Sequence, residues 1–134
     1  MGWREDLGRA KATVYAQQAR GSTRRGRIPR WARRDAAVFA LLGAGLTPVQ
    51  VENARRIVAT GGRRVAVGFE GEPEVSVELE SGHEVSWLCD YVAQCRPGDP
   101  IFPSERGRRQ LSAHAVRLQV RRWAARSRDR RRSS

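Results

Sequence analysis

The sequence predicts a mainly helical α+β domain that contains one small antiparallel β-hairpin. Apolar residues at helical spacing, a switch to two-residue alternation near residues 65–79, and glycine or proline breaks between these stretches predict this class. With 134 residues, 40% of them hydrophobic, the chain is long enough to bury one core. We expect a basic N-terminal helix and flexible arm over residues 1–29, a domain over residues 30–126, and a basic disordered tail over residues 127–134.

The N-terminal part predicts a helix over roughly Glu5–Ala19, which ends at the break Gly21-Ser22-Thr23. An arginine-rich arm follows, and such an arm is typically flexible until it lies along a phosphate backbone. Candidate DNA-contacting residues in the arm and directly after it are Arg24, Arg25, Arg27, Arg30, Arg33 and Arg34.

The stretch Asp35–Ala44 is almost wholly apolar and predicts a buried helix, which Gly43 and Gly45 end. A second helix start follows at Thr47, because a threonine N-cap, a proline at the next position and a glutamine three residues after the cap form a capping box. This helix is expected to run to about Ala59 and to pack through Val51, Ala54, Ile57 and Val58.

Gly61-Gly62 is expected to end that helix, and a β-hairpin follows. Its apolar face is formed by Val65, Val67, Phe69, Val75, Val77 and Leu79. A further helix is predicted over His83–Gln94. It should turn Val85, Leu88, Cys89 and Val92 inward, with Trp87 and Tyr91 on a neighbouring side, before a break at residues 96–100.

The last predicted helix opens with Ser112 as N-cap and runs to Arg126. A helical wheel divides it into two sides. The packing side holds Ala113, Val116, Val120, Trp123 and Ala124. The exposed side suits base edges and a thymine methyl group. The remaining candidate DNA-binding residues lie on this helix or just before it. They are Arg108, Arg109, His114, Arg117, Leu118, Arg121 and Arg122. An ordinary surface helix in an arginine-biased chain remains an alternative, since Lys11 is the only lysine.

The charge of the chain indicates a polyanionic partner. The formal net charge is +12 and the isoelectric point about 11.5, a balance typical of nucleic-acid binders. Residues 1–34 hold ten Lys/Arg and residues 96–134 hold twelve, whereas residues 65–95 hold none. We therefore expect both ends to face duplex DNA, and the acidic hairpin Glu70–Glu80 to face away or to meet a protein partner.

The remaining composition indicates no cofactor and no metal. Cys89 and Cys95, with His83 and His114, match no familiar zinc-ligand spacing. Without a leader or a long apolar run, we expect a reduced cytoplasmic protein that does not contact membranes, encoded by a bacterium or phage and associated with the nucleoid when bound.

Over about residues 30–126 the chain resembles the first part of the catalytic domain of tyrosine recombinases (phage integrases). The resemblance lies in Arg34-Asp35 with AAVFALLGAGL at Ala36–Leu46, in the hairpin at Arg64–Leu79, and in IFPSERG…LS…V at Ile101–Val116. It implies a truncated integrase-like core whose helix after Leu111-Ser112 lies in the DNA major groove.

The catalytic residues of that family are absent at the matching positions. Thr47 stands where the first catalytic arginine follows the Gly-Leu pair, and glutamates replace the lysine of the hairpin turn. The only tyrosines, Tyr15 and Tyr91, precede the place of the nucleophile, and the chain ends where the second half of the domain should start. His114-Ala115-Val116-Arg117 has the His-x-x-Arg form of the second motif, but it comes too soon after Phe-Pro-Ser. We interpret the match as coincidental and expect no enzyme activity, because cleavage needs cations around the reacting phosphate.

We therefore expect a sequence-specific double-stranded DNA-binding protein, such as a phage or mobile-element repressor, with its oligomeric state open. One alternative is a winged helix-turn-helix factor with Asn53, Arg55 and Arg56 on its reading helix, although its wing would be acidic. Others are a recombinase accessory or fragment that acts in DNA integration by borrowing residues from a partner chain, and a basic RNA-associated domain.

Overall fold

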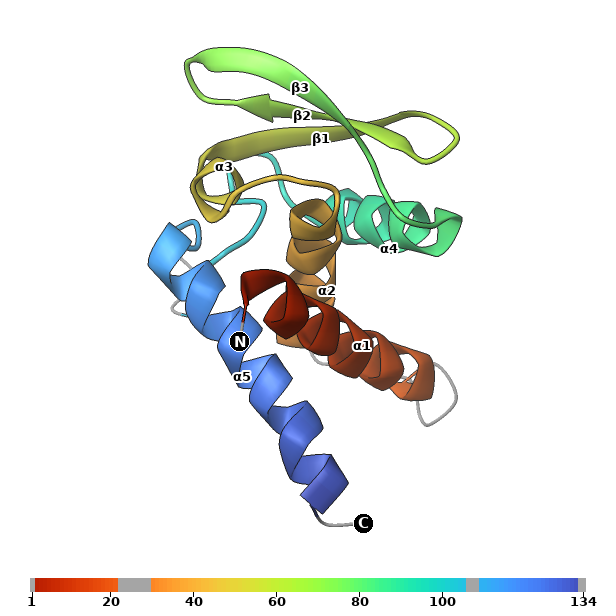
Figure 1. Cartoon of the computed structure of the whole chain (residues 1–134). Coiled ribbons are helices and arrows are strands. Elements are labelled where there is room, and N and C mark those ends of the chain that lie inside the picture. Colours follow the sequence, from red (N-terminus) through yellow and green to blue (C-terminus); the bar gives the residue numbers. More distant parts are fainter. Residues whose placement is uncertain (1, 22–29, 106–108, 133–134) are drawn as a thin grey trace.

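Helix α2 (Arg30–Gly43) lies at the centre of the structure, which is a computed structural model that describes residues 2–21, 30–105 and 109–132. It contacts all four other helices. Figure 1 shows α2 beneath the three-stranded sheet and between α1 and α4. The other elements are α1 (Trp3–Gly21), α3 (Pro48–Asn53), β1 (Ala54–Gly61), β2 (Arg64–Phe69), β3 (Glu72–Glu78), α4 (Gly82–Ala93) and α5 (Ala113–Arg132). The predicted mainly helical α+β class is confirmed.

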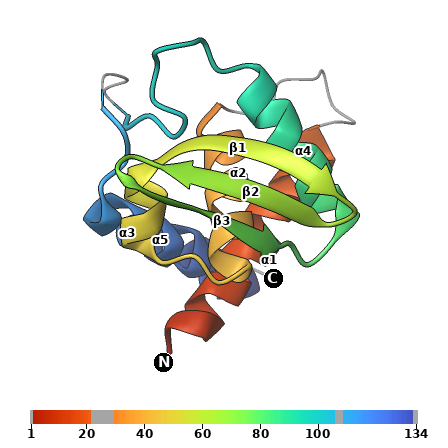
Figure 2. The same ribbon diagram turned by 90° about the horizontal axis from the view of Figure 1, so that it is seen from above.

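The core lies between the sheet and the helices. Figure 2, seen from above, shows the sheet in front with α1, α2 and α5 behind it, so its other face carries no helix in the described part of the chain. Phe39 of α2 is fully buried, as are Val67 of β2 and Val116 of α5. Helix α1 adds Leu7, Ala10 and Val14 to this core. It packs on α2 and α5 and is therefore part of the same folded unit as residues 30–132.

The helix predicted to run from Thr47 to about Ala59 is wrong in its second half. The capping box is present, with Thr47 Oγ1 accepting from the Gln50 amide at 3.2 Å and Gln50 Oε1 accepting from the Thr47 amide at 2.8 Å. However, α3 ends at Asn53 and the chain continues as β1. Strand alternation turns Ile57 inward and leaves Val58 60% exposed. Pairing with β2 overrides the local helical pattern because it satisfies the whole backbone of this stretch.

The predicted hairpin is part of a three-stranded antiparallel sheet in the order β1-β2-β3. Val67 is the central residue, opposite Ile57 on one side and Val75 on the other. Gly61 ends β1 and Gly62 follows it in the turn to β2, at φ angles of 138° and 57°. Glycine adopts such positive angles at little cost. These two glycines therefore connect two strands and do not end a helix.

Helix α4 begins and ends within one residue of its predicted limits, with Ser81 as N-cap. Leu88 faces the core as predicted, while Val85, Cys89 and Val92 are only partly buried. Tyr91, expected on a neighbouring side, is buried, and its hydroxyl donates a 2.7 Å hydrogen bond to the Ile101 carbonyl. This bond fixes the chain segment that leads to α5.

Helix α5 is longer than predicted and continues to Arg132, so the disordered tail expected over residues 127–134 is wrong for residues 127–132. The predicted arm residues Arg24, Arg25 and Arg27 lie outside the described residues, as does Arg108.

Candidate nucleic-acid interface

The N-terminus of α5 is held by its N-cap Ser112, by Glu52 of α3 and by Gln110 of the preceding segment. Ser112 Oγ accepts from the Ala115 amide at 3.1 Å, as predicted for an N-cap, and Glu52 Oε1 of α3 accepts from the Ala113 amide at 3.2 Å. Gln110 donates to the Val51 and Ala54 carbonyls and accepts from the Phe102 amide. These bonds satisfy free amides at the start of the helix and tie its first turn to α3.

The inner face of α5 is the one predicted from the wheel. Val116 and Val120 are fully buried, and Trp123 is 5% exposed. The Trp123 indole N–H donates to Asp35 Oδ2 of α2 at 2.8 Å. Ala113 and Ala124 complete the buried side. The prediction for the packing side of this helix is confirmed.

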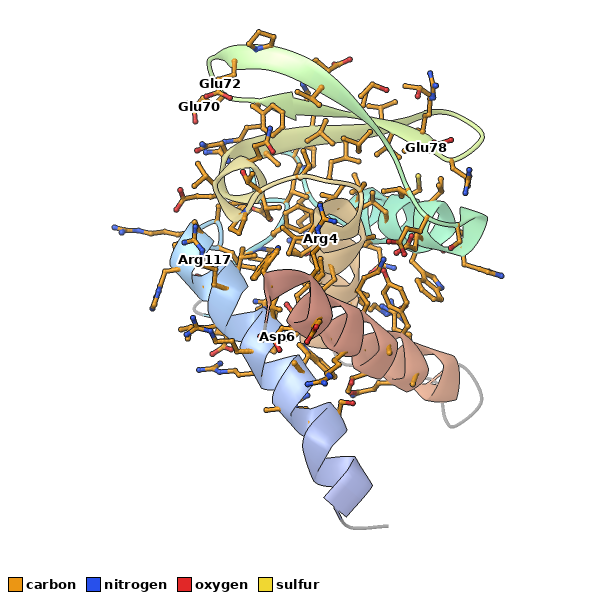
Figure 3. All side chains as sticks on the ribbon, in the orientation of Figure 1. Arg4, Asp6, Glu70, Glu72, Glu78 and Arg117 are labelled. Atoms are coloured by element: carbon orange, nitrogen blue, oxygen red, sulfur yellow. The ribbon has the colours of Figure 1, made fainter. Side chains whose placement is uncertain are left out.

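The outer face of α5 carries basic side chains in solvent. His114, Arg117 and Arg121 are exposed and Leu118 is half-buried, in agreement with the wheel. Figure 3 shows Arg117 on the outer side of α5, away from α1, with Glu70, Glu72 and Glu78 on the sheet. We call His114, Arg117, Leu118 and Arg121 the α5 ridge. The residues of the ridge rise along one side of the helix over two turns, which is the spacing at which a helix contacts successive base pairs in a major groove.

An acidic residue lies beside the ridge. Glu105 Oε1 is 3.6 Å from Arg122 Nη1 and accepts from the Gln119 amide group at 3.4 Å. The side chains of Glu105 and Arg122 are 60% and 58% exposed, so this ion pair is weak and the arginine can exchange it for a phosphate. Nothing in the apolar periodicity of the sequence indicates that Glu105 lies here.

Arg34 was predicted to contact DNA, and this prediction is wrong. The side chain is 1% exposed; its Nη2 lies 2.9 Å from Asp35 Oδ1, and its Nη1 donates to the Pro103 carbonyl at 2.9 Å. Its guanidinium also lies 4.6 Å from the centre of the Trp31 ring. A buried arginine satisfied in this way cannot reach a phosphate. Its role is to join α2 to the segment before α5.

The same network changes the ionisation of Asp35. Burial raises the pKa of this carboxyl above its ordinary value, and the Arg34 guanidinium and the Trp123 indole N–H offset the rise only in part. Of the other predicted residues, Arg109 and Arg122 are exposed and Arg33 is half-buried. Arg30 begins α2, and its side chain lies outside the described residues.

A shallow hollow of about 280 Å³ lies beside the ridge, between α5 and the segment before it. Its lining includes Leu111, Ala115 and Leu118 as well as Glu105 and Arg122. The apolar part has room for a methyl group, and Arg122 is also part of the lining. The half-buried position of Leu118 thus agrees with a contact surface that is not purely ionic.

The described part of the chain holds no group of three His, Cys, Asp or Glu side chains that could bind a metal ion. Within the same ranges, no helix has the length and apolar character needed to cross a bilayer.

By fold and surface the chain is a small, strongly basic α+β protein whose last helix presents arginines to solvent. Comparisons of the chain with protein-family models, with curated proteins and with solved structures found no match.

Proposed function

We propose that this protein binds double-stranded DNA in a sequence-specific manner through α5 and acts as a transcriptional regulator, such as a phage or mobile-element repressor in the cytoplasm. The proposal rests on one observation: α5 buries Val116, Val120 and Trp123 while the α5 ridge stands in solvent. A helix anchored on one side and basic on the other has the shape and charge that a major groove accepts.

The charge distribution supports this orientation. Exposed arginines line α5, whereas the exposed glutamates Glu70, Glu72, Glu74 and Glu78 lie on or next to the sheet strands. The sheet and its turn also carry the exposed arginines Arg55, Arg56, Arg63 and Arg64, so the charges of this surface largely cancel. The surplus of arginines on α5 is what the phosphates of a duplex attract. The preferred approach therefore brings α5 to the DNA and turns the sheet away, where a protein partner could bind it.

We further propose that the domain is a catalytically inactive relative of the tyrosine recombinases, on the residue matches at Ala36–Leu46 and Ile101–Val116. Thr47, at the position of the first catalytic arginine, is a helix cap, and Glu70 is paired with Arg55 at 3.1 Å. Neither group offers a cation to a phosphate. No covalent protein–DNA adduct is expected on a nicked suicide substrate, and the appearance of one would show that the chain cleaves DNA.

The winged helix-turn-helix alternative loses its reading helix in this fold. Asn53 is the last residue of α3, and Arg55 and Arg56 belong to β1. Since these three residues do not share a helix face, they cannot enter a groove together as a recognition helix.

The decisive experiment is selection of bound duplexes from a random pool at moderate salt. We expect enrichment of a defined site, and equal affinity for random and selected duplexes would reject the proposal. The Arg117→Ala variant should lose about 1–3 kcal/mol of discrimination at one base pair. Arg63→Ala is the matched control, because Arg63 is also exposed but lies in the turn between β1 and β2, where its ion pair with Glu78 is exposed.

RNA provides the competing outcome. If RNA displaces duplex DNA from the protein at equal salt, and the pool yields no site, the α5 ridge serves a different nucleic acid. Displacement only by duplexes that contain the selected site supports the proposal.

A further inference from the structure

A groove lies between α1 and the turn that connects α2 to α3. Its volume is about 770 Å³, and its walls include Trp3 and Leu7 of α1 and Leu42, Leu46 and Pro48 across from them. Among the described residues, the exposed large hydrophobic side chains include Trp3, 39% exposed, and Val49, 49% exposed, which follows Pro48. The lining is mixed, because charged side chains such as Arg4 and Glu80 lie in it beside the apolar ones. Exposed hydrophobic residues next to such a groove are typical of a protein contact surface.

One end of the groove carries negative charge. Lys11 Nζ lies 2.6 Å from Glu80 Oε2 and 3.0 Å from Glu84 Oε2, and Glu84 is only 2% exposed. Glu84 also accepts a hydrogen bond from the Tyr15 hydroxyl. Burial, together with this carboxylate, raises the pKa of Tyr15, so the phenol stays neutral. Two carboxylates against one ammonium leave a net negative charge, and the Glu80 side chain is 63% exposed. A small anion is therefore disfavoured here.

The other end carries positive charge. Arg4, the second residue of α1, lines the groove, and its side chain points to a different side of the helix from that of Asp6 (Figure 3). Seven residues separate Arg4 from Lys11, which corresponds to about 10 Å along the helix axis. The groove is thus positive near Arg4 and negative near Glu80.

Gly8 lies between these ends, in the interior of α1. A Cβ atom built at Gly8 would meet nothing within 4 Å, so the fold of the single chain does not require a glycine there. Glycine in a helix interior lowers helix stability. A glycine on a helix surface allows the backbone of another molecule to approach closely, because it has no side chain that would keep the two apart.

We propose that a second copy of this chain occupies the groove, with the two α1 helices crossing antiparallel about a two-fold axis near Gly8. In this arrangement Arg4 of each copy faces the Glu80 end of the other, and Trp3 of each enters the other's groove. The groove is self-complementary because its two ends have opposite charge, which is the condition for a two-fold interface. This dimer is a property of the protein without DNA and goes beyond the proposed function.

Sedimentation velocity of the full chain over a range of concentrations, without DNA, tests the dimer. We expect a monomer–dimer equilibrium that Gly8→Leu and Trp3→Ala each weaken at least tenfold. Gly8→Leu has open space around it and improves helix propensity, so a loss of dimer cannot be attributed to misfolding. Circular dichroism of the monomer checks this point.

Two variants serve as matched controls. Ala93→Leu adds the same side chain at an exposed position at the end of α4, and Val58→Ser removes an exposed hydrophobic residue from β1. Both should dimerise like the natural chain. A chain that is monomeric at every concentration, or a dimer that Gly8→Leu leaves intact, overturns the proposal.

A cross-linking measurement reports the geometry directly. Under mild oxidation, Gly8→Cys should form a disulfide between two copies, because the proposed axis passes near this position, whereas Ala93→Cys should not. Equal cross-linking of the two variants would contradict the two-fold arrangement. Neither experiment contains DNA, so a protein that does not dimerise would overturn the dimer proposal without bearing on the DNA-binding proposal.

Discussion

Asp35 and Trp123 illustrate how one buried polar contact holds α5 against α2 at the centre of the fold. Asp35 Oδ1 accepts from Arg34 and Oδ2 accepts from the Trp123 indole, so both carboxylate oxygens have donors. The indole joins α5 to α2, and Arg34 joins α2 to the Pro103 carbonyl. Because such groups are costly to leave unpaired, the position of α5 depends on residues that never reach solvent.

Trp123→Phe should destabilise the protein by about 1–3 kcal/mol, because it leaves a buried carboxylate oxygen without its donor and the smaller phenyl ring leaves part of the space of the indole unfilled. Urea denaturation measures this change. Val58→Thr is the control: Val58 is 60% exposed on β1, and its substitution should change the free energy of unfolding little. Equal stability of the Trp123→Phe variant and the natural chain would contradict the role assigned to the indole.

The raised pKa of Asp35 gives the stability a defined pH dependence. The folded protein retains this proton to a higher pH than the unfolded chain, whose value is about 3.8. Between these two pKa values the folded state binds more protons than the unfolded state, so the free energy of unfolding falls as pH rises. Above the pKa of the folded state, the stability that this proton provides is lost. Asp35→Asn should remove this part of the pH dependence in urea denaturation measured from about pH 4 upward. An unchanged slope in Asp35→Asn would show that other groups produce it.

At the scale of elements, the start of α5 is determined by contacts from three places in the chain. Ser112 caps the helix locally, Glu52 accepts an amide of its first turn from α3, and Gln110 bonds the end of α3 and Phe102. The helix thus begins where α3 ends in space. This connection places the ridge relative to the sheet and to α1.

Ser112→Ala should cost about 1 kcal/mol, as expected for the loss of a serine N-cap. Because Glu52 still accepts a hydrogen bond from the Ala113 amide, α5 should remain helical. The protein should then keep its proposed preference for one DNA sequence. Thermal unfolding and duplex selection on the same variant measure the two effects. Ser86→Ala, at an exposed position of α4, is the control and should change neither. A collapse of DNA preference in Ser112→Ala would mean that the cap contacts the DNA itself.

At the scale of the whole molecule, the surplus of positive charge lies on α5, whereas the exposed arginines and glutamates of the sheet largely cancel one another. The arginines exposed on α5 include Arg117, Arg121 and Arg126, the last with its guanidinium 4.3 Å from the centre of the Trp123 ring. The sheet carries exposed glutamates, some of which are paired with nearby arginines across the surface. Such a separation orients the protein before contact and makes association depend on ionic strength.

DNA affinity should therefore fall steeply with salt. If about six to ten phosphates are neutralised, a plot of log affinity against log salt concentration has a slope near −5 to −9. The double variant Glu72→Gln/Glu74→Gln should leave that slope unchanged, because these exposed side chains lie on β3, away from the ridge. Fluorescence anisotropy over a salt series measures both slopes. A slope near zero would exclude phosphate contacts as the main source of affinity, and a changed slope in the double variant would place the sheet near the DNA.

The amino-acid sequence by itself determined the two sides of α5, the capping box at Thr47, the strands of β2 and β3 and the limits of α4. These features depend on periodicity and on side chains that bond to nearby backbone. The tertiary structure alone decided that residues 54–61 form a strand, because their apolar spacing suits both a helix and a strand until β2 is present to pair with them. It also decided that Arg34 is buried, since an arginine in the sequence does not disclose whether a carboxylate and a carbonyl from a distant segment will enclose it.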